Sequence, residues 1–104
     1  MTRKEYNGWT NFETWIVKLW IDNEEGTQLY FREQAERTLK EDGPYDQDSD
    51  HVRKLAAIVQ QEHEDSLPKL EGFAADLINA ALSEVNWEEI ASSLLDDAKE
   101  ALEA

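Results

Sequence analysis

The spacing of apolar residues constrains this chain most, because it follows the helical period in five separate segments. The segments are separated by glycine, proline or polar residues, which commonly end helices. No stretch shows the sustained alternation of apolar and polar residues that is typical of a half-buried strand. A chain of 104 residues has room for one hydrophobic core. We therefore predict one all-α domain over residues 1–104, folded as a compact bundle of four to five short helices.

Each predicted helix carries an apolar stripe with spacings of three and four residues. The predicted ranges are 11–22, 24–40, 49–64, 68–84 and 87 to the last few residues. Proline is acceptable in a first turn, so Pro68 is expected to begin the fourth helix. The stripes expected to face the core are Phe12, Trp15, Ile16, Leu19 and Trp20; Phe31, Ala35 and Leu39; Val52, Leu55, Ile58 and Val59, with Glu62 as a candidate fifth member; Leu70, Phe73, Ala74, Leu77, Ile78 and Ala81; and Trp87, Ile90, Ala91, Leu94, Leu95, Ala98 and Leu102.

Polar residues next to the stripes predict how three of the helices begin. Thr10 and Glu13 have the spacing of a capping box, in which a hydroxyl and a carboxylate each satisfy a backbone amide at the helix start. Asn86 and Glu89 repeat this spacing before the fifth helix, and Asn23 is placed to cap the second. These assignments give each polar residue a role within its own helix.

Charge is the strongest compositional signal. The chain has 24 Asp and Glu against 10 Lys and Arg, a formal net charge of −14. Residues 1–23 are balanced, with three cations and three anions, whereas residues 67–104 have two cations and nine anions, a net of −7. Direct binding to nucleic acid or to an anionic membrane is disfavoured, and a basic protein partner is favoured. The candidate interaction residues are Glu71, Asp76, Glu84, Glu88, Glu89, Asp96, Asp97, Glu100 and Glu103.

Several chemistries are not expected from this composition. The chain has no cysteine, so it offers no disulfide, thiolate ligand or thiol nucleophile, and a reducing cytoplasmic location is the default expectation. No apolar run reaches eighteen residues, and no export signal follows the first residues, so we expect neither a membrane span nor export. Phosphate-loop, metalloprotease and nucleophile-elbow motifs are missing, and the carboxylates are too numerous for any pair to be singled out. We expect no enzyme activity and no cofactor.

One acidic run has the opening spacing of a calcium loop. Asp46, Asp48 and Asp50 would supply the first, third and fifth ligands. The sixth position is His51 rather than glycine, and the twelfth is Ala57 rather than glutamate, so the turn and the bidentate ligand are both missing. We therefore expect no metal site here.

The two histidines, His51 and His63, lie twelve residues apart on one predicted helix. That spacing separates them by about 18 Å, so they cannot share a metal ion within the helix. His63 stands between two glutamates and is expected to face solvent rather than act as a general base.

The aromatic residues near the N-terminus have two interpretations. Stacking on single-stranded bases would need a positive groove around the rings, and this part of the chain has few cations. As core residues, the rings would contribute roughly 2 to 3 kcal/mol each. We assign Trp15 to the core and expect Trp9 and Trp20, near the edges of the stripe, to be partly exposed.

The best-marked segment is NGWTNFETWIVKLWIDN, residues 7–23, in which Asn7-Gly8 predicts a turn. It resembles a family of small uncharacterised proteins of bacteria, archaea, phages and plasmids that share the pattern N-G-W-x-N-x-E-T-W-x-V-x-L-W-x-x-N. The resemblance implies a setting of mobile elements and their hosts, and it implies no activity. The matching residues are Asn7, Gly8, Trp9, Asn11, Glu13, Thr14, Trp15, Val17, Leu19, Trp20 and Asn23.

Two functional hypotheses follow. The first is a non-enzymatic interaction protein, an acidic inhibitor or DNA mimic associated with a mobile element, which binds a basic protein partner. The alternative is a small-ligand or peptide site in the N-terminal segment. A third interpretation is that acidity serves only solubility. The residues of the alternative site are Asn7, Trp9, Asn11, Glu13, Trp20 and Asn23.

Overall fold

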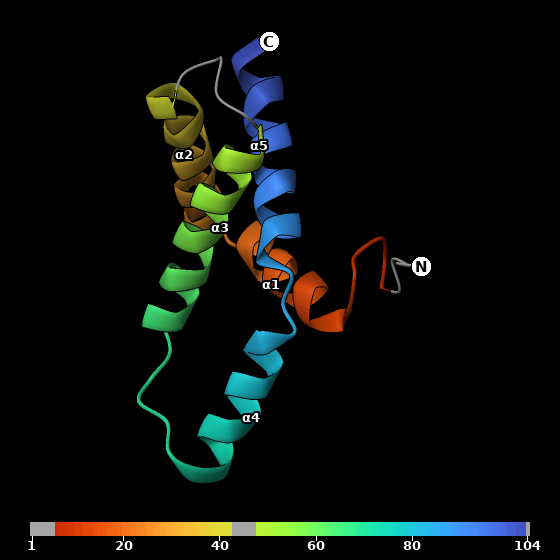
Figure 1. Ribbon diagram of the computed structural model, residues 1–104, viewed down its shortest axis with the longest axis vertical. Coiled ribbons are helices and arrows are strands. Elements are labelled where there is room, and N and C mark those ends of the chain that lie inside the picture. The colour runs from red at the N-terminus through yellow and green to blue at the C-terminus, as the bar shows by residue number, and fades with distance from the viewer. Residues whose placement is uncertain (1–5, 43–47, 104) are drawn as a thin grey trace.

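A computed structural model describes residues 6–42 and 48–103. The described residues form five helices (Figure 1), which confirms the all-α prediction. Their only strand-like feature is an isolated bridge between Tyr6 and Trp9. The helices are α1 (Phe12–Asn23), α2 (Glu25–Asp42), α3 (Asp48–Asp65), α4 (Gly72–Ser83) and α5 (Trp87–Glu103).

The core lies around α5. This helix packs most extensively against α3 and α2, and these three helices run side by side in Figure 1. Helix α1 packs against α2 and α5. The buried apolar residues are Ile21, Phe31, Ala35, Leu55, Ala56, Val59, Val85, Trp87, Ile90, Ala91, Leu94, Leu95 and Ala98.

Helix α5 has the most clearly amphipathic sequence, and the prediction for it is confirmed except at one position. Six of the seven residues assigned to its stripe, from Trp87 to Ala98, are buried. Leu102 is exposed instead, because it lies one turn beyond the last buried residue of the helix. On α2, Phe31 and Ala35 are buried and Leu39 is half-buried against the core, as predicted.

Helix α1 departs from the predicted orientation. Its buried residues are Thr14, Lys18 and Ile21, not the aromatic stripe. Trp15 is only half-buried, and its ring lies 4.8 Å from that of Tyr6 and 5.7 Å from that of Phe12.

Polar partners explain why α1 presents this side to the core. The Lys18 Nζ donates to both oxygens of Asp22, at 2.9 and 2.8 Å, so its charge is compensated where its stem is buried. Thr14 bonds to the start of α5, as described below. Trp20 is 63 % exposed, in agreement with its expected edge position.

Helix α4 was predicted too long and in the wrong environment. It begins at Gly72 rather than Pro68, and it contains no buried residue. Among the described residues, no other helix packs extensively on it, and in Figure 1 it projects away from the other four. The residues assigned to its inward stripe, including Phe73 and Leu77, are therefore not core residues.

One histidine of α3 also differs from the prediction. His63 is half-buried rather than solvent-facing, because its Nδ1 bonds to the carbonyl of Val59 at 2.8 Å and its ring stacks on Phe31, with centroids 5.5 Å apart. The ring of Trp87, on α5, lies 5.7 Å from the His63 ring, measured between centroids. His51 is buried. On the predicted stripe of α3, Leu55 and Val59 are buried and Val52 and Ile58 pack against the core, as predicted, whereas Glu62 is exposed.

Candidate functional site

The N-terminal motif begins with a tight turn, as the Asn7-Gly8 dipeptide predicts. Tyr6 and Trp9 exchange two backbone hydrogen bonds, of 3.0 and 2.7 Å. Asn7 has φ of 49° and Gly8 has φ of 90°. Positive φ at both central residues is the geometry that favours Asn-Gly in two-residue turns. The turn brings Trp9 back against the core.

Asn11, not Thr10, is the N-cap of α1. Its Oδ1 accepts from the Thr14 backbone N–H at 2.9 Å and from the Thr14 hydroxyl at 2.6 Å. The predicted capping box of Thr10 and Glu13 is therefore wrong by one residue. Glu13 lies in the first turn of α1, where its charge faces the positive end of the helix dipole.

The same two side chains connect α1 to the start of α5. Asn11 Nδ2 donates to the backbone carbonyl of Glu84 at 2.7 Å. The hydroxyl of Thr14, fully buried, accepts from the backbone N–H of Asn86 at 2.8 Å. We call this set of contacts, made by Asn11 and Thr14 to Glu84 and Asn86, the Asn11–Thr14 clamp. It fixes the connection between α4 and α5 against the N-terminus of α1.

The start of α5 follows the predicted capping box in one half only. Asn86 Oδ1 accepts from the Glu89 backbone N–H at 3.0 Å, as predicted. The reciprocal bond is not made, because the Asn86 N–H donates to Thr14 instead. The Glu89 carboxylate accepts from the backbone N–H of Thr10 at 3.1 Å. Glu89 thereby holds the motif segment against α5.

An open cleft lies where the turn meets α5. It has a volume of about 350 Å³. Trp9 provides an aromatic wall, and Asp96 and Asp97 provide exposed carboxylates. The structure thus brings one residue of the motif site together with three of the acidic candidates. The lining residues are Gly8, Trp9, Glu89, Ser92, Ser93, Asp96 and Asp97.

Four acidic residues continue from this cleft along the outer side of α5. Glu89, Asp96, Glu100 and Glu103 are spaced by seven, four and three residues, so they share one side of the helix, over about 21 Å. We call these four the acidic stripe. Asp96, Glu100 and Glu103 are exposed, and the opposite side of α5 is buried in the core.

The other acidic candidates lie elsewhere. Glu88 projects from a different side of α5, by its position one residue before Glu89. Glu71, Asp76 and Glu84 are exposed on α4 or at its ends. They do not extend the acidic stripe.

Trp20 and Asn23, two further candidates of the motif site, are separated from the cleft. Trp9 and Trp20 lie near opposite ends of α1, a helix of 12 residues and therefore about 18 Å long. Asn23 is the last residue of α1, and Glu24 occupies the position before α2, so the predicted Asn23 cap is wrong. The site predicted from the sequence therefore includes residues, such as Trp9 and Trp20, that lie at opposite ends of α1.

A second open cavity, of about 450 Å³, lies at the far end of α1. Trp20, Tyr30 and His63 contribute rings to it, and Glu24 and Glu62 contribute carboxylates. Partial burial raises the pKa of Tyr30, and the hydrogen bond between its side chain and that of Glu62 raises the pKa further. The phenol is therefore protonated over the neutral range. No pattern along the chain predicts this cavity, because its walls come from three helices.

The fold and these contacts define a small acidic all-α protein whose N-terminal motif is bonded to its last helix. In the described part, no helix is long and apolar enough to cross a membrane. Among residues 6–42 and 48–103, no group of three or more His, Asp or Glu side chains could hold a metal ion. Asp46, the first residue of the acidic run that was rejected as a calcium loop, lies outside the described residues.

A family model matches residues 2–103, and the chain belongs to that family, DUF7249, a family of unknown function. The match extends over nearly the whole chain, whereas the resemblance drawn from the sequence covers residues 7–23. No curated protein and no solved structure matches the chain.

Proposed function

We propose that this protein is a non-enzymatic interaction protein that binds a basic protein partner through the acidic stripe and the adjoining cleft. The cleft carries the proposal, because it combines an indole ring with the exposed carboxylates of Asp96 and Asp97. A guanidinium or ammonium group can pair with such carboxylates and can also stack on the face of an aromatic ring. An arginine or lysine side chain of the partner is the group that fits.

The acidic stripe extends this recognition over a longer surface. A row of carboxylates on one rigid helix offers a basic groove several contacts at once, as phosphates on a nucleic acid strand do. The DNA groove of a nuclease or a repressor is the partner class we infer. The net charge of −14 would accelerate association and make it dependent on salt.

A pair of variants with equal charge tests this proposal. Partners retained from a native host extract at low salt are identified by mass spectrometry, and the affinity of each purified basic candidate is measured by calorimetry. Asp96→Asn/Asp97→Asn should weaken binding at least about tenfold, as expected when two charge-assisted bonds are lost. Glu25→Gln/Glu33→Gln, which removes the same charge from exposed positions on α2, should change affinity less than about twofold.

Two results would contradict the proposal. One is an equal loss of affinity in both variants, which would assign the effect to net charge rather than to the cleft. The other is an affinity that does not fall between about 50 and 300 mM salt, because charge-driven association is screened in that range.

A second candidate function is favoured by the cavity at the far end of α1. Its exposed Trp20 and Tyr30 rings, with Glu24 and Glu62, suit the guanidinium group of a peptide ligand. N-acetyl-arginine amide should shift the Trp20 indole resonance in an NMR titration, and N-acetyl-leucine amide should not. Equal shifts with both amides would reject this candidate. So would shifts of other resonances that N-acetyl-arginine amide still causes in the Trp20→Ala variant.

A further inference from the structure

The Asn7-Gly8 pair combines two properties that make an asparagine side chain chemically reactive. The first is its neighbour, because a glycine has no Cβ to crowd its backbone nitrogen, and the preceding side chain can approach that nitrogen closely. The second is exposure, since both residues lie in contact with solvent at the tip of the turn. Asn7 is the only asparagine of the chain that precedes a glycine. The five asparagines are Asn7, Asn11, Asn23, Asn79 and Asn86.

The turn leaves the atoms of this pair open to reaction. Its two hydrogen bonds join Tyr6 and Trp9, so they use no backbone group of the two central residues. A Cβ placed on Gly8 would meet no atom within 4 Å outside its immediate neighbours in the chain. The side chain of Asn7 therefore has room to fold over the Gly8 nitrogen.

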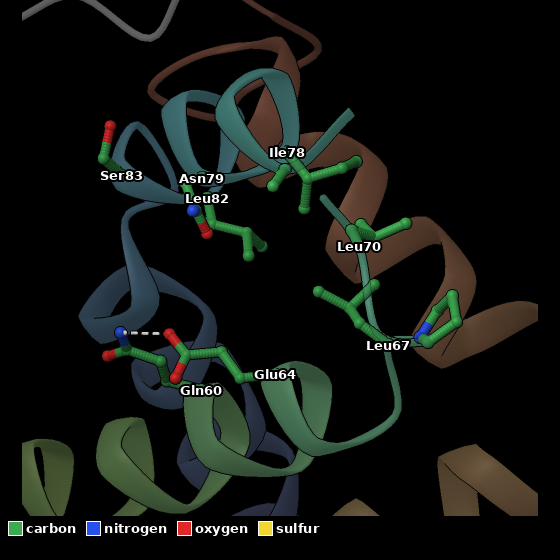
Figure 2. A pocket seen from close by; sticks show the side chains of 10 residues that line it. Gln60, Glu64, Leu67, Leu70, Ile78, Asn79, Leu82 and Ser83 are labelled. Carbon is green, nitrogen blue, oxygen red and sulfur yellow. Dashed lines mark hydrogen bonds between the residues drawn. The ribbon is translucent and has the colours of Figure 1, made fainter. Parts of the chain in front are cut away.

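The other asparagines differ from Asn7 in their bonds and in their neighbours. The side chains of Asn11 and Asn86 are held as helix caps. Asn79 is the closest comparison, because it is also exposed and its side chain lines an open hollow of about 480 Å³ beside α4 (Figure 2). It lies inside a helix, whose hydrogen bonds engage the backbone N–H groups, and the next residue, Ala80, has a Cβ. Exposure alone therefore does not distinguish Asn7.

We propose that Asn7 is a site of spontaneous deamidation, which converts the Asn7-Gly8 linkage to aspartyl and isoaspartyl forms. The Gly8 backbone nitrogen attacks Cγ of Asn7, and the new C–N bond closes a succinimide ring. The bond from Cγ to Nδ2 breaks, and Nδ2 leaves as ammonia with the proton that the Gly8 nitrogen gives up. Water is the only co-reactant. It adds to one of the two ring carbonyl carbons and breaks the bond from that carbon to the Gly8 nitrogen, with no oxidation or reduction.

The two products differ in the path of the main chain. Addition of water at Cγ gives aspartate, and the main chain is unchanged. Addition at the backbone carbonyl carbon gives isoaspartate, in which the main chain runs through Cβ and Cγ and is one atom longer. Asp-Gly suits the same two-residue turn as Asn-Gly. The longer isoaspartyl linkage does not fit a turn of fixed length, so it should break the pairing of Tyr6 with Trp9.

The turn forms part of the cleft, so the two products should have different effects there. Isoaspartate would release Trp9 from the position in which it lines the cleft. Aspartate would keep the ring in place and add a carboxylate beside Gly8, at the edge of the cleft. A loss of partner binding as the protein ages follows for isoaspartate only, and this consequence rests on the proposed function. The covalent step itself needs no partner.

Ageing of the purified, folded chain tests the modification site. Mildly alkaline buffer is used, because loss of its proton makes the Gly8 nitrogen a better nucleophile. Peptide mapping by mass spectrometry measures deamidation at each asparagine, and labelling by protein L-isoaspartate methyltransferase measures isoaspartate. Asn7 should react at least about tenfold faster than Asn79, and isoaspartate should form at position 7. Equal rates at Asn7 and Asn79, or no isoaspartate at position 7, would overturn the proposal.

Hydrogen exchange tests the effect of isoaspartate on the turn. Asn7→Asp is the matched control, because it adds the same charge without lengthening the main chain. The Trp9 amide donates to the Tyr6 carbonyl at 2.7 Å. It should exchange at least about tenfold faster in the isolated isoaspartyl form, and within about twofold of the unmodified rate in freshly prepared Asn7→Asp. Equal protection of this amide in all three chains would contradict the predicted opening of the turn.

A basic partner separates this inference from the proposed function. The isoaspartyl form should bind that partner at least about tenfold more weakly than Asn7→Asp does. Equal affinities, with isoaspartate present and the turn open, would contradict a role of Trp9 in binding and leave the modification site established. An Asn7 side chain that stays intact would reject the modification site, and the proposed function would still be decided by the Asp96 and Asp97 variants.

Discussion

The Thr14 hydroxyl group serves two helices at once. It donates a hydrogen bond to Asn11, the N-cap of α1, and it accepts one from the backbone N–H of Asn86, just before α5. A buried amide that loses such a partner costs about 1 to 3 kcal/mol. The motif residues Asn11 and Thr14 therefore do more than begin α1, because their bonds also hold the connection before α5.

A change that preserves the cap but removes the clamp separates these two roles. Asp is as good an N-cap as Asn, so a purely local role predicts that Asn11→Asp leaves the free energy of unfolding nearly unchanged. The clamp predicts a loss of about 1 kcal/mol, the net contribution of one hydrogen bond, because the carboxylate cannot donate to the Glu84 carbonyl. Urea denaturation measures the difference.

Asn86→Asp is the matched control, since it makes the same change at another N-cap. Its Oδ1 cap to Glu89 can be kept, and only a long bond of 3.4 Å from its Nδ2 to Thr10 is lost. We expect a change below about 0.5 kcal/mol. Equal effects of the two substitutions would show that the contact between Asn11 and Glu84 adds nothing measurable to the free energy of unfolding.

At this scale the sequence predicted the turn and the Asn86 cap but not the clamp. Capping rules consider residues three or four apart, and they assigned Thr10 and Glu13 to a local box. The actual partners of Asn11 and Thr14 lie more than seventy residues away. Only packing of α1 on α5 brings them together, and no local pattern describes that packing.

At the scale of helices, amphipathic contrast decided which predictions succeeded. Helix α5 has a buried side and an acidic side, so its spacing predicted its orientation through Ala98. Contrast is weaker in α4, where Asp76, Asn79 and Ser83 form a narrow polar side, and no other helix of the described part packs extensively on the wide apolar side that the spacing predicted to face the core. Helix α1 was misassigned because its buried side includes Thr14 and Lys18, whose polar atoms find partners.

Replacing two glycines by alanine should change the stability of the protein in opposite directions. Gly26 lies in the first turn of α2, and an added Cβ would meet no atom within 4 Å. Gly26→Ala should stabilise the protein by about 0.5 to 1 kcal/mol, because alanine favours the helix and loses less entropy on folding. Thermal unfolding followed by circular dichroism measures this change.

Gly8→Ala should have the opposite effect. Space is equally open there, but its φ of 90° is strained for any residue with a Cβ. We expect a loss of about 1 kcal/mol or more. A stabilising Gly8→Ala would mean that the turn does not keep this backbone conformation.

At the scale of the whole molecule, the net charge of −14 acts against the fold that carries it. The radius of gyration is 14.5 Å, which is shorter than the Debye length of about 30 Å at 10 mM salt. Carboxylates across the whole molecule therefore repel one another in dilute buffer. At about 150 mM salt the Debye length falls to about 8 Å, and only neighbouring charges interact.

The melting temperature should therefore rise by several degrees between about 10 and 150 mM sodium chloride, because screening relieves repulsion in the compact state. The increase should level off above that range, where screening is nearly complete. Measurement at low protein concentration separates this effect from self-association. A melting temperature that is constant or falls over this interval would show that the carboxylates are spaced too widely to repel.

Composition could predict this acidity and the class of partner it favours, but not where the charges gather. The cleft depends on the Asn7-Gly8 turn, which returns Trp9 to α5 beside Asp96 and Asp97. Neither the turn nor the helix reveals the other's position from its own sequence.

The Asn11–Thr14 clamp also orders the events of biosynthesis. The motif leaves the ribosome well before the backbone groups of Glu84 and Asn86 that its side chains bind, which follow it by 73 and 72 residues. Until then the N-terminal segment can form its turn and the beginning of a helix, but it has nothing to dock onto. Although the motif is synthesised before α5, it should accordingly be among the last segments of this domain to become protected from hydrogen exchange in a nascent chain.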